Sequence, residues 1–428
     1  MLASSLVGAA VPGLPLAWLQ SELELEGLLG GLTRFDDLSQ LVVGIAVLVA
    51  LFALWSIVGS PGSVEYAILV LIFLVSVTLT VSFSNLILFY LFWEITALCA
   101  WGLSRWSTFS EDYSAGAFPM QGAGALGSLC MLLAVMLLVA ENRSLSMSGL
   151  NTQWTQAVWL LLLTAVFLKG YGLIAQGWRH DLDKAYGVSR GLVASAGAVT
   201  LSAYPYLRFF GDNFAGQEGW RELTLWYAIP LASLVLLAGL SENDIHRIIS
   251  STAFAQFCMV MLGLALFTGQ GSSGALLGMV AYALGVSALF FCTGVLESRA
   301  KRESLELLRG MAPSLPVTAF LFVFSALAFA GLPPSAGFIS RLILGAEYLR
   351  ADQISLLVAT LAISGLTLLV NLRLFVRAFL GPPSAQVSEG NWAVLLGVLG
   401  ILCLLVYLGL QPEEGLRWVQ PALLVVSR

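Results

Sequence analysis

The stretch Asn85–Leu103, NLILFYLFWEITALCAWGL, is apolar over a length that can cross a lipid bilayer as a single helix. One residue interrupts the pattern, because the carboxylic acid Glu94 lies near its middle. A charged side chain at the centre of a bilayer costs about 2.5 to 3.5 kcal/mol on insertion scales. Such a residue needs either a buried structural partner or a function, and ionisable groups inside membranes are functional candidates by default.

The whole chain has the same character. Hydrophobic residues make up 58% of the 428 residues and charged residues 11%, well below the roughly 25% of a soluble domain. We therefore expect an all-α integral membrane protein, a bundle of helices whose outer faces contact lipid. We predict an N-terminal interfacial segment at 1–34, one polytopic transmembrane domain at 35–411 and a short C-terminal tail at 412–428. The first segment begins without Lys or Arg before its apolar run, which is atypical of a cleaved signal peptide.

At about 20 apolar residues per crossing, the sequence predicts about twelve spans. They lie near 39–58, 64–83, 85–104, 117–140, 157–178, 187–208, 224–240, 248–268, 273–296, 314–333, 355–378 and 392–411. The residues after Pro333 and Pro334 look like a continuation of the tenth span beyond a break. We predict a second break beside Lys169, at Gly170 and Gly172. The two breaks lie in corresponding parts of two halves, which suggests inverted repeats.

The distribution of Lys and Arg predicts the orientation of the chain. The loops after odd-numbered spans carry most of these residues, with the densest group at 297–310, which places those loops in the cytoplasm and both termini outside. A bacterial plasma membrane is the expected location. Arg190 and Arg208 are assigned to loops on opposite sides, so that only Lys169 and Arg341 remain within spans. His180 and His246 fall in cytoplasmic loops, where a solvated histidine is more frequent than a proton relay.

Other classes of protein lack support. The five cysteines lie in apolar runs without a CxxC pair, so we expect no metal or iron-sulfur cluster in this chain. Phosphate-binding glycine motifs are absent, as are basic runs of the kind that bind nucleic acid. We therefore predict a chain without a cofactor and without a redox site of its own.

The charged residues within spans allow two interpretations each. Glu94 is either a carboxyl group held by hydrogen bonds between packed helices or part of a proton relay that pairs with Lys169. Such an ion pair can exchange a proton, because each partner favours the charged form of the other. Arg341 stays charged at essentially any pH, so it is a fixed counter-charge, an anchor or a snorkelling side chain rather than a proton carrier.

Several segments resemble one known family, the antiporter-like membrane subunits of respiratory complex I, membrane-bound hydrogenases and Mrp-type cation/proton antiporters. FYLFWEITAL is similar to its FFxFWE segment, which matches Glu94 to the glutamate of the fifth family helix. FLKGYGLIAQGWRHDLDKA resembles VKxPxxPxHxWLPDAH, which matches Lys169 to the lysine of the seventh helix. SENDIHRIISSTAFAQFCMVMLGL, which contains Gln256, resembles DIKRxxAYSSISxMG, and GLPPSAGFISRLIL resembles GLPPxSGFxxK. FDDLSQ is similar to the DgLS start of the third helix, and the likeness runs from about residue 30 to about residue 380.

The chain also departs from the family pattern. The usual fourteen helices would be twelve here, and the prolines of two family loops become Gly170 and Gly187. The lysine of the eighth helix falls on Thr200, and the HxxxK pair falls on Tyr282 and Val286. The lysine or glutamate of the twelfth helix falls on Arg341. The resemblance thus implies the ion-translocation candidates Glu94, Lys169, Thr200, Gln256, Tyr282 and Arg341, with the second half poorly equipped for protons.

Three functions remain open on the sequence. The resemblance favours a subunit that translocates protons or sodium in a larger membrane complex, such as an NADH:quinone oxidoreductase or a hydrogenase, with other membrane subunits as partners. A scaffold subunit that has lost its channel is the second reading, favoured by Thr200, Tyr282 and Val286. The third is the membrane partner of an inorganic-carbon uptake system.

Overall fold

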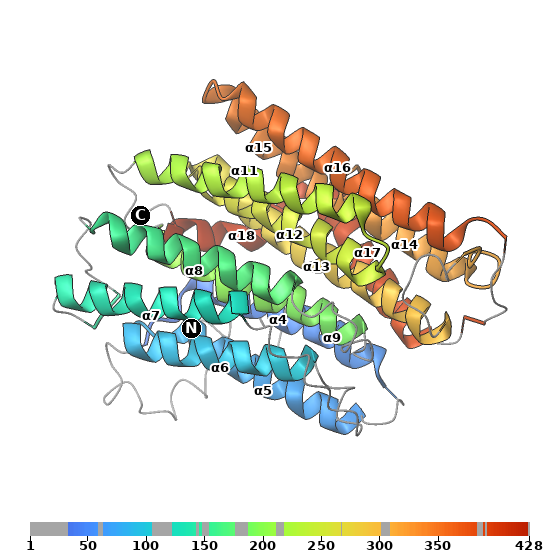
Figure 1. The fold of residues 1–428 in the computed structure, drawn as a ribbon, viewed down its shortest axis with the longest axis horizontal. Helices are drawn as coiled ribbons and strands as arrows, with labels where there is room; N and C mark the ends of the chain where they lie inside the picture. The colour runs from blue at the N-terminus through green and yellow to red at the C-terminus, as the bar shows by residue number, and fades with distance from the viewer. Residues whose placement is uncertain are drawn as a thin grey trace.

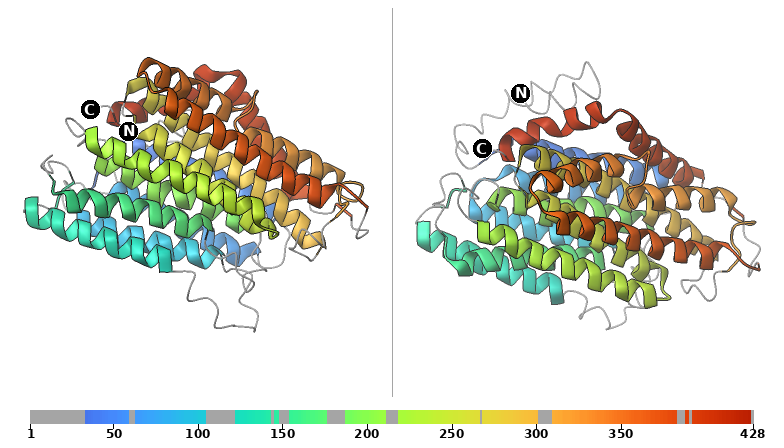
Figure 2. Two further views of the ribbon diagram at one scale, coloured as in Figure 1. Left: turned by 45° about the horizontal axis from the view of Figure 1, so that its top comes forward. Right: turned by 90° about the horizontal axis from the view of Figure 1, so that it is seen from above.

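The computed structural model of the chain is a bundle of helices whose long axes run in roughly the same direction (Figure 1, Figure 2). It describes residues 33–426, apart from 59–62, 105–121, 143–144, 148–153, 176–186, 211–217, 267, 301–308, 383–387 and 390–391. In these described residues the only β-type pairing is two isolated bridges, so the predicted all-α class is confirmed. His180 lies outside the described residues, as does most of the predicted N-terminal segment.

The predicted spans coincide with helices or helical runs. In chain order these are α4 (Asp37–Ser56), α5 (Ser63–Ser82), α6 (Leu86–Ser104), α7 (Gly122–Asn142), α8 (Gln156–Ala175), α9 (Gly187–Leu192), η4 (Val193–Gly197), η5 (Val199–Ala203), α10 (Tyr204–Phe210), α11 (Glu218–Ser241), α12 (Ile245–Leu264), α13 (Gly269–Ala300), α14 (Pro316–Phe329), α15 (Ala336–Arg350), α16 (Ile354–Phe379), α17 (Trp392–Leu410) and α18 (Pro412–Val426). The sixth predicted span is one helical run from α9 to α10, with the π-helical turns η4 and η5 in its middle. Turns of this kind are rare and occur often at functional sites.

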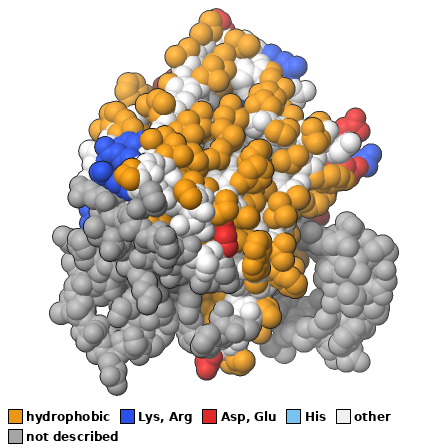
Figure 3. All heavy atoms as spheres, turned by 90° about the vertical axis from the view of Figure 1, so that its right-hand side faces the viewer, with side chains coloured by type: hydrophobic (Ala, Val, Ile, Leu, Met, Phe, Trp, Pro, Cys, Tyr) orange, Lys and Arg blue, Asp and Glu red, His pale blue; other side chains and the backbone are white. Residues whose placement is uncertain are grey.

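The bundle has the composition and burial of a membrane protein. Within the described residues, nine helices are long and apolar enough to cross a bilayer. Hydrophobic side chains cover most of the described surface visible in Figure 3. The apolar windows of α12 and α13 are 94% buried, whereas that of α11 is 28% buried. The centre of the bundle is therefore formed by α12 and α13, and the outer helices present apolar faces.

The predicted break at the two prolines is confirmed. α14 ends at Phe329 and α15 begins at Ala336, where the hydroxyl of Ser335 caps the new helix by accepting from the Phe338 N–H. α16 packs along both α14 and α15, as Figure 1 shows, so the two short helices together cover the length of one span. Gly331 has a φ of 73°, and the guanidinium of Arg341 lies where a side chain at this glycine would be.

The second predicted break, at Gly170 and Gly172 beside Lys169, is wrong. α8 continues as a regular helix through Gly170 and Gly172 to Ala175. A Cβ at Gly170 would lie 2.8 Å from the Phe257 ring and 3.1 Å from the Ser202 hydroxyl oxygen. Gly170 therefore allows α12 and η5 to approach α8 closely, and it does not interrupt the helix.

The C-terminal residues form a further helix. α18 occupies most of the predicted tail at 412–428 and packs against α4 and α13. Figure 2 shows α17 and α18 meeting at an angle at one side of the bundle.

Candidate functional site

The structure brings Glu94 of α6 and Lys169 of α8 into contact. The ammonium Nζ of Lys169 donates to Glu94 Oε1 at 3.0 Å and to the hydroxyl oxygen of Ser128 on α7 at 2.6 Å. It also lies 4.2 Å from the centroid of the Trp93 ring, a cation–π contact. The Lys169 side chain is 5% exposed and that of Glu94 is 28% exposed. The pair thus joins a buried cation to a carboxylate that reaches the edge of the bundle.

Local packing fixes the geometry of this pair. A Cβ at Gly127 would lie 3.2 Å from the Lys169 backbone nitrogen, so this glycine lets α7 approach α8 closely and places Ser128 beside the ammonium. The Trp93 indole N–H donates to the Leu201 carbonyl of η5 at 3.0 Å. This bond orients the ring whose face the ammonium contacts, and it links the pair to the π-helical segment.

The contacts around Lys169 favour its charged form. A carboxylate, a hydroxyl oxygen and an aromatic face surround the ammonium within a buried site, so the Coulomb attraction and the hydrogen bonds counteract part of the loss of hydration. If the pair separates, each group is left in an apolar environment that favours its neutral form. The arrangement can therefore hold a proton in one geometry and release it in another.

The segment η5, which packs against α8, carries two buried hydroxyl groups. Thr200 and Ser202 are both fully buried, and their hydroxyl oxygens have no hydrogen-bond partner among the described residues. Ser202 is the residue whose hydroxyl comes close to Gly170, the neighbour of Lys169 in α8. Thr200, predicted from its alignment with the family lysine, thus lies on the segment that Trp93 binds. The π-helical turns thus carry polar groups with hydrogen-bonding capacity on a segment that packs against both α8 and α6.

The second half of the bundle contains a similar contact between different residue types. Arg341 of α15 donates from Nη2 to Gln256 Oε1 of α12 at 2.5 Å and to the Phe329 carbonyl at 3.1 Å. The Gln256 amide donates in turn to the Thr367 hydroxyl at 2.8 Å. Within the described ranges, no carboxylate forms an ion pair with Arg341. This contact therefore joins a permanent cation to a neutral amide.

Tyr282 belongs to the same region. Its hydroxyl donates to the Ala194 carbonyl of η4 at 2.9 Å, and its ring lies between those of Phe257 and Phe329, each centroid 6.1 Å away. Tyr282 thus connects the π-helical run to the cavity beside Arg341, which it helps to line. Val286, the other residue aligned with the HxxxK pair, is fully buried and apolar.

Two of the predicted loop residues are in fact part of a buried charged cluster. Arg190 of α9 is 1% exposed and His246 of α12 is 2% exposed, so the assignment of both to solvated loops is wrong. Arg190 Nη1 lies 3.2 Å from Glu297 Oε2 of α13, and His246 Nε2 lies 2.5 Å from Glu297 Oε1. Arg190 also contacts the His246 ring. α12 begins inside the bundle, capped by the Asp244 carboxylate, and this early start carries His246 out of the predicted loop.

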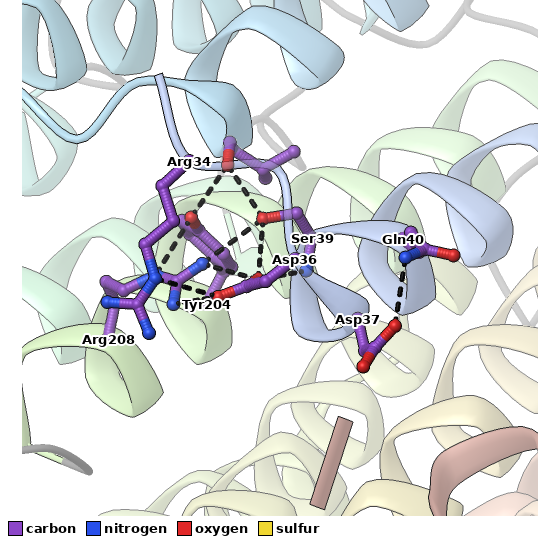
Figure 4. A network of polar contacts seen from close by, with 8 residues as sticks. Arg34, Asp36, Asp37, Ser39, Gln40, Tyr204 and Arg208 are labelled. Carbon is purple, nitrogen blue, oxygen red and sulfur yellow. Dashed lines mark hydrogen bonds and ion pairs between the residues drawn. The ribbon is translucent and has the colours of Figure 1, made fainter. Parts of the chain in front are cut away.

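Arg208 is likewise buried rather than placed in a loop. Figure 4 shows its guanidinium facing Asp36 at the start of α4, with Nη1 2.7 Å from Oδ2 and Nη2 2.8 Å from Oδ1. Arg208 also donates to the hydroxyl oxygens of Tyr204 at 3.1 Å and Ser39 at 3.2 Å. Asp36 is the N-cap of α4 and accepts from the Ser39 N–H. This bidentate pair ties α10 to the beginning of α4.

The same contacts set the acidity of the Asp36 carboxyl. Burial by itself would raise the pKa of this carboxyl, but the hydrogen bond and charge of Arg208, the Ser39 N–H and the charge of Arg34 hold that pKa below its ordinary value. Asp36, Arg208, Arg190, His246 and Glu297 were not predicted as partners. The available signal was the presence of charged residues within a few positions of the predicted ends of apolar runs.

Comparisons with known proteins give one consistent result. Among curated relatives, the NAD(P)H-quinone oxidoreductase chain 4 2 of Thermosynechococcus vestitus is 26% identical over 342 residues, which cover 78% of this chain and 62% of the relative. The NADH-quinone oxidoreductase subunit M of Rickettsia bellii is 24% identical over 350 residues, 78% of this chain and 69% of the relative. The chain thus spans about three fifths of the length of the first relatives that it matches.

A solved structure supports the fold. A chain in the structure of the Mrp complex from Dietzia sp. DQ12-45-1b superimposes with a TM-score of 0.78 at 19% identity, covering 100% of this chain and 96% of that one. The family model described as NADH:quinone oxidoreductase/Mrp antiporter, TM, matches residues 83–367, which is more than half of the sequence and includes both contacts, Glu94–Lys169 and Gln256–Arg341. The predicted resemblance is therefore confirmed, and the protein belongs to the NADH:quinone oxidoreductase/Mrp antiporter transmembrane family.

Proposed function

We propose that this chain translocates protons or sodium ions as one subunit of a larger membrane complex, of the kind represented by NADH:quinone oxidoreductases, hydrogenases or Mrp antiporters. The observation that carries the proposal is the contact between Lys169 Nζ and Glu94 Oε1 at 3.0 Å, inside a multi-pass membrane bundle. A structural role needs only a hydrogen-bonding partner for each group. A contact between two titratable groups of opposite charge can in addition exchange a proton.

The surroundings of the pair fit a switch. When the two groups are in contact, each keeps the other charged in a region of low dielectric constant. A rearrangement that separates them favours the neutral forms, so Lys169 releases a proton while Glu94 takes one up. The Ser128 hydroxyl contacts Lys169 and the Ser202 hydroxyl lies close to Gly170, the next residue in α8, so a moving proton would have polar groups near the pair.

The position of Glu94 supports partner subunits. Only 33% of the apolar window of α6 is buried, and the Glu94 side chain is 28% exposed on this helix. A carboxylate that faced lipid hydrocarbon would be strongly unfavourable. Another membrane subunit over this face of α6 would cover Glu94, and a rearrangement in that subunit would act directly on the pair.

A scaffold subunit is the second candidate. It is favoured by the contact between Gln256 and Arg341, because neither an amide nor a guanidinium exchanges a proton at physiological pH. On this reading the first half keeps its ion pair for stability alone. The two candidates differ in what happens when Glu94 loses its charge.

The test is ion uptake by vesicles that contain the purified complex with Glu94→Gln or Lys169→Ala. We expect each variant to assemble fully and to lose at least about a hundredfold of coupled uptake, the scale on which positioned proton-transfer groups act. Glu65→Gln is the matched control, because Glu65 is an exposed carboxylate in the first turn of the neighbouring helix α5. A pH-sensitive dye and radioactive sodium distinguish the two ions. Full uptake by an assembled Glu94→Gln complex would favour the scaffold instead.

The proposed orientation places the protein in a bacterial plasma membrane, with the α11–α12 turn in the cytoplasm. Arg373 donates to the Glu242 carbonyl and Arg377 to Asn243, so basic side chains surround this turn, as the positive-inside rule favours. A cysteine at the exposed Asn243 should react with an impermeant maleimide only from inside, and one at the exposed Ala351 only from outside. The reverse labelling would contradict the orientation.

A further inference from the structure

A cavity lies beside Arg341 in the second half of the bundle. It has a volume of about 40 Å³, which is room for more than one water-sized ligand. Its polar lining comes from α12, α13, α15 and α16 and consists of Gln256, Tyr282, Ser340, Arg341 and Thr360. The remaining lining is apolar or glycine, so the guanidinium is the only charged group among the residues that line it.

One side of this guanidinium has no protein partner. Arg341 uses Nη2 for Gln256 and for the Phe329 carbonyl. Its Nη1 is buried and has no hydrogen-bond acceptor among the residues that the structure describes. A buried charged donor without an acceptor is strongly unfavourable, and so is a buried cation without a counter-charge. Arg341 lines the cavity, so an occupant that carries negative charge would give this guanidinium its counter-charge.

The protein groups around the cavity select the class of that occupant. The hydroxyls of Tyr282, Ser340 and Thr360 already donate to backbone carbonyls, at 2.9, 2.7 and 2.8 Å respectively, so the selection rests on the charge of Arg341. A metal cation would lie against the positive charge of Arg341, and an apolar ligand would leave Nη1 without an acceptor. A small anion satisfies both the charge and the donor, and its size must match a cavity of a few water molecules.

We propose that the cavity beside Arg341 binds a small monovalent inorganic anion of the chloride class. In this arrangement the anion provides the negative charge that the Glu94 carboxylate provides to Lys169 in the first half. Gln256 occupies the position beside the cation from which a carboxylate would otherwise act. The proposal concerns binding alone and holds whether or not the first half translocates ions.

The test is the thermal unfolding of the purified full chain in lipid nanodiscs, in sodium chloride against sodium gluconate at equal ionic strength. A bound anion stabilises the folded state in proportion to the logarithm of its concentration above Kd. We expect a rise in Tm with chloride, and a similar rise with bromide, that gluconate does not produce because it is too large for the cavity. The linewidth of the ³⁵Cl resonance gives a second measure of binding that does not depend on unfolding.

Three variants separate this site from general salt effects. Gln256→Glu places a fixed carboxylate against Arg341 and should abolish the chloride response while the chain stays folded. Arg341→Gln removes the cation and should abolish it as well. Arg350→Gln, an exposed arginine on the same helix, should retain the full response. A wild-type chain without a chloride response, or a Gln256→Glu chain that keeps it, would overturn the proposal.

Discussion

The two halves of the bundle each hold a cation within the spans against a partner of different chemistry. In the first half, Lys169 of α8 contacts Glu94 of α6, and α7 lies between these two helices in the order of the chain. In the second half, Arg341 of α15 contacts Gln256 of α12, with α13 between α12 and the broken helix α14–α15. The first contact joins two titratable groups and the second joins a permanent cation to an amide. The comparison shows that one bundle holds both a pair of titratable groups and a fixed charge against an amide.

The difference has a consequence for ion movement. An ammonium can release its proton when its counter-charge leaves, whereas a guanidinium keeps its charge at any pH that a cell reaches. We therefore expect proton exchange at the first contact and only electrostatic influence from the second. The cluster of Arg190, His246 and Glu297 lies on α9, α12 and α13 and so spans both halves.

The largest expected effect tests whether the first contact acts as one unit. Glu94→Gln and Lys169→Ala each remove the switch, so the double variant should be no slower than either single variant. Proton or sodium uptake in vesicles, measured beside subunit content, gives the three rates. If the fold loss of uptake in the double variant equals the product of the fold losses in the two single variants, Glu94 and Lys169 act independently. The first contact is then not a single unit, and the comparison of the two contacts fails.

A somewhat smaller effect comes from making the first half resemble the second. Lys169→Arg keeps a positive charge beside Glu94 but removes the group that can release a proton, so uptake should fall by at least about tenfold. The complex should assemble, since a guanidinium also pairs well with a carboxylate. Wild-type uptake by this variant would show that a permanent charge is sufficient in the first half too.

The sequence was informative wherever a residue contrasted with its surroundings. Glu94 and Lys169 are isolated charges in apolar runs, and the structure brings them into contact. Pro333 and Pro334 predicted a real break, because proline cannot continue a helix. Gly170 misled the prediction, since a glycine within a helix indicates either a break or a close approach, and only the position of Phe257 decides between them.

Residues near the ends of spans were harder to interpret. Arg190, Arg208 and His246 lie within a few residues of helix ends, where boundaries from hydropathy are uncertain, and each was assigned to a loop. The structure buries all three. Their partners lie far away in the sequence, as Asp36 does from Arg208, so a single sequence carries no signal for the pairing. The role of the predicted residues in transport stays a prediction.

A moderate effect is expected in the second half. If Arg341 acts through its charge, Arg341→Lys should keep most of the uptake, whereas Arg341→Ala should reduce it several-fold. If the residue is instead an anchor that must bind Gln256 and the Phe329 carbonyl at once, the lysine variant should fail as well. Equal uptake by both variants and the wild type would leave Arg341 without any part in ion movement.

The smallest effect on transport is expected at the pair of Asp36 and Arg208, which lies at the edge of the first half. Here the charge serves stability, so Asp36→Asn should leave uptake unchanged and should lower stability by up to about 3 to 5 kcal/mol, because Arg208 is left buried without a counter-charge. Asparagine is also a good N-cap, so this variant removes the charge and retains the cap of α4. Asp244→Asn at the start of α12 is the matched control, since Asp244 caps its helix through the N–H groups of His246 and Arg247.

The pH dependence of the stability difference between the wild type and Asp36→Asn identifies the ion pair as the source of that difference. Because the pKa of the folded Asp36 carboxyl lies below its ordinary value, the pair contributes its full stability above the unfolded pKa of about 3.9. That contribution disappears as the pH falls through the lower pKa of the folded state, where the wild-type carboxyl becomes neutral like the asparagine. The Tm difference between wild type and Asp36→Asn should therefore be constant from pH 7 to about 5 and shrink below about 4.

Asp244→Asn should show a small difference from wild type at neutral pH, of the size expected for a charge at a helix N-terminus. An Asp36→Asn difference that grew as the pH fell, or that Asp244→Asn matched at pH 7, would show that the cap and not the ion pair stabilises the start of α4.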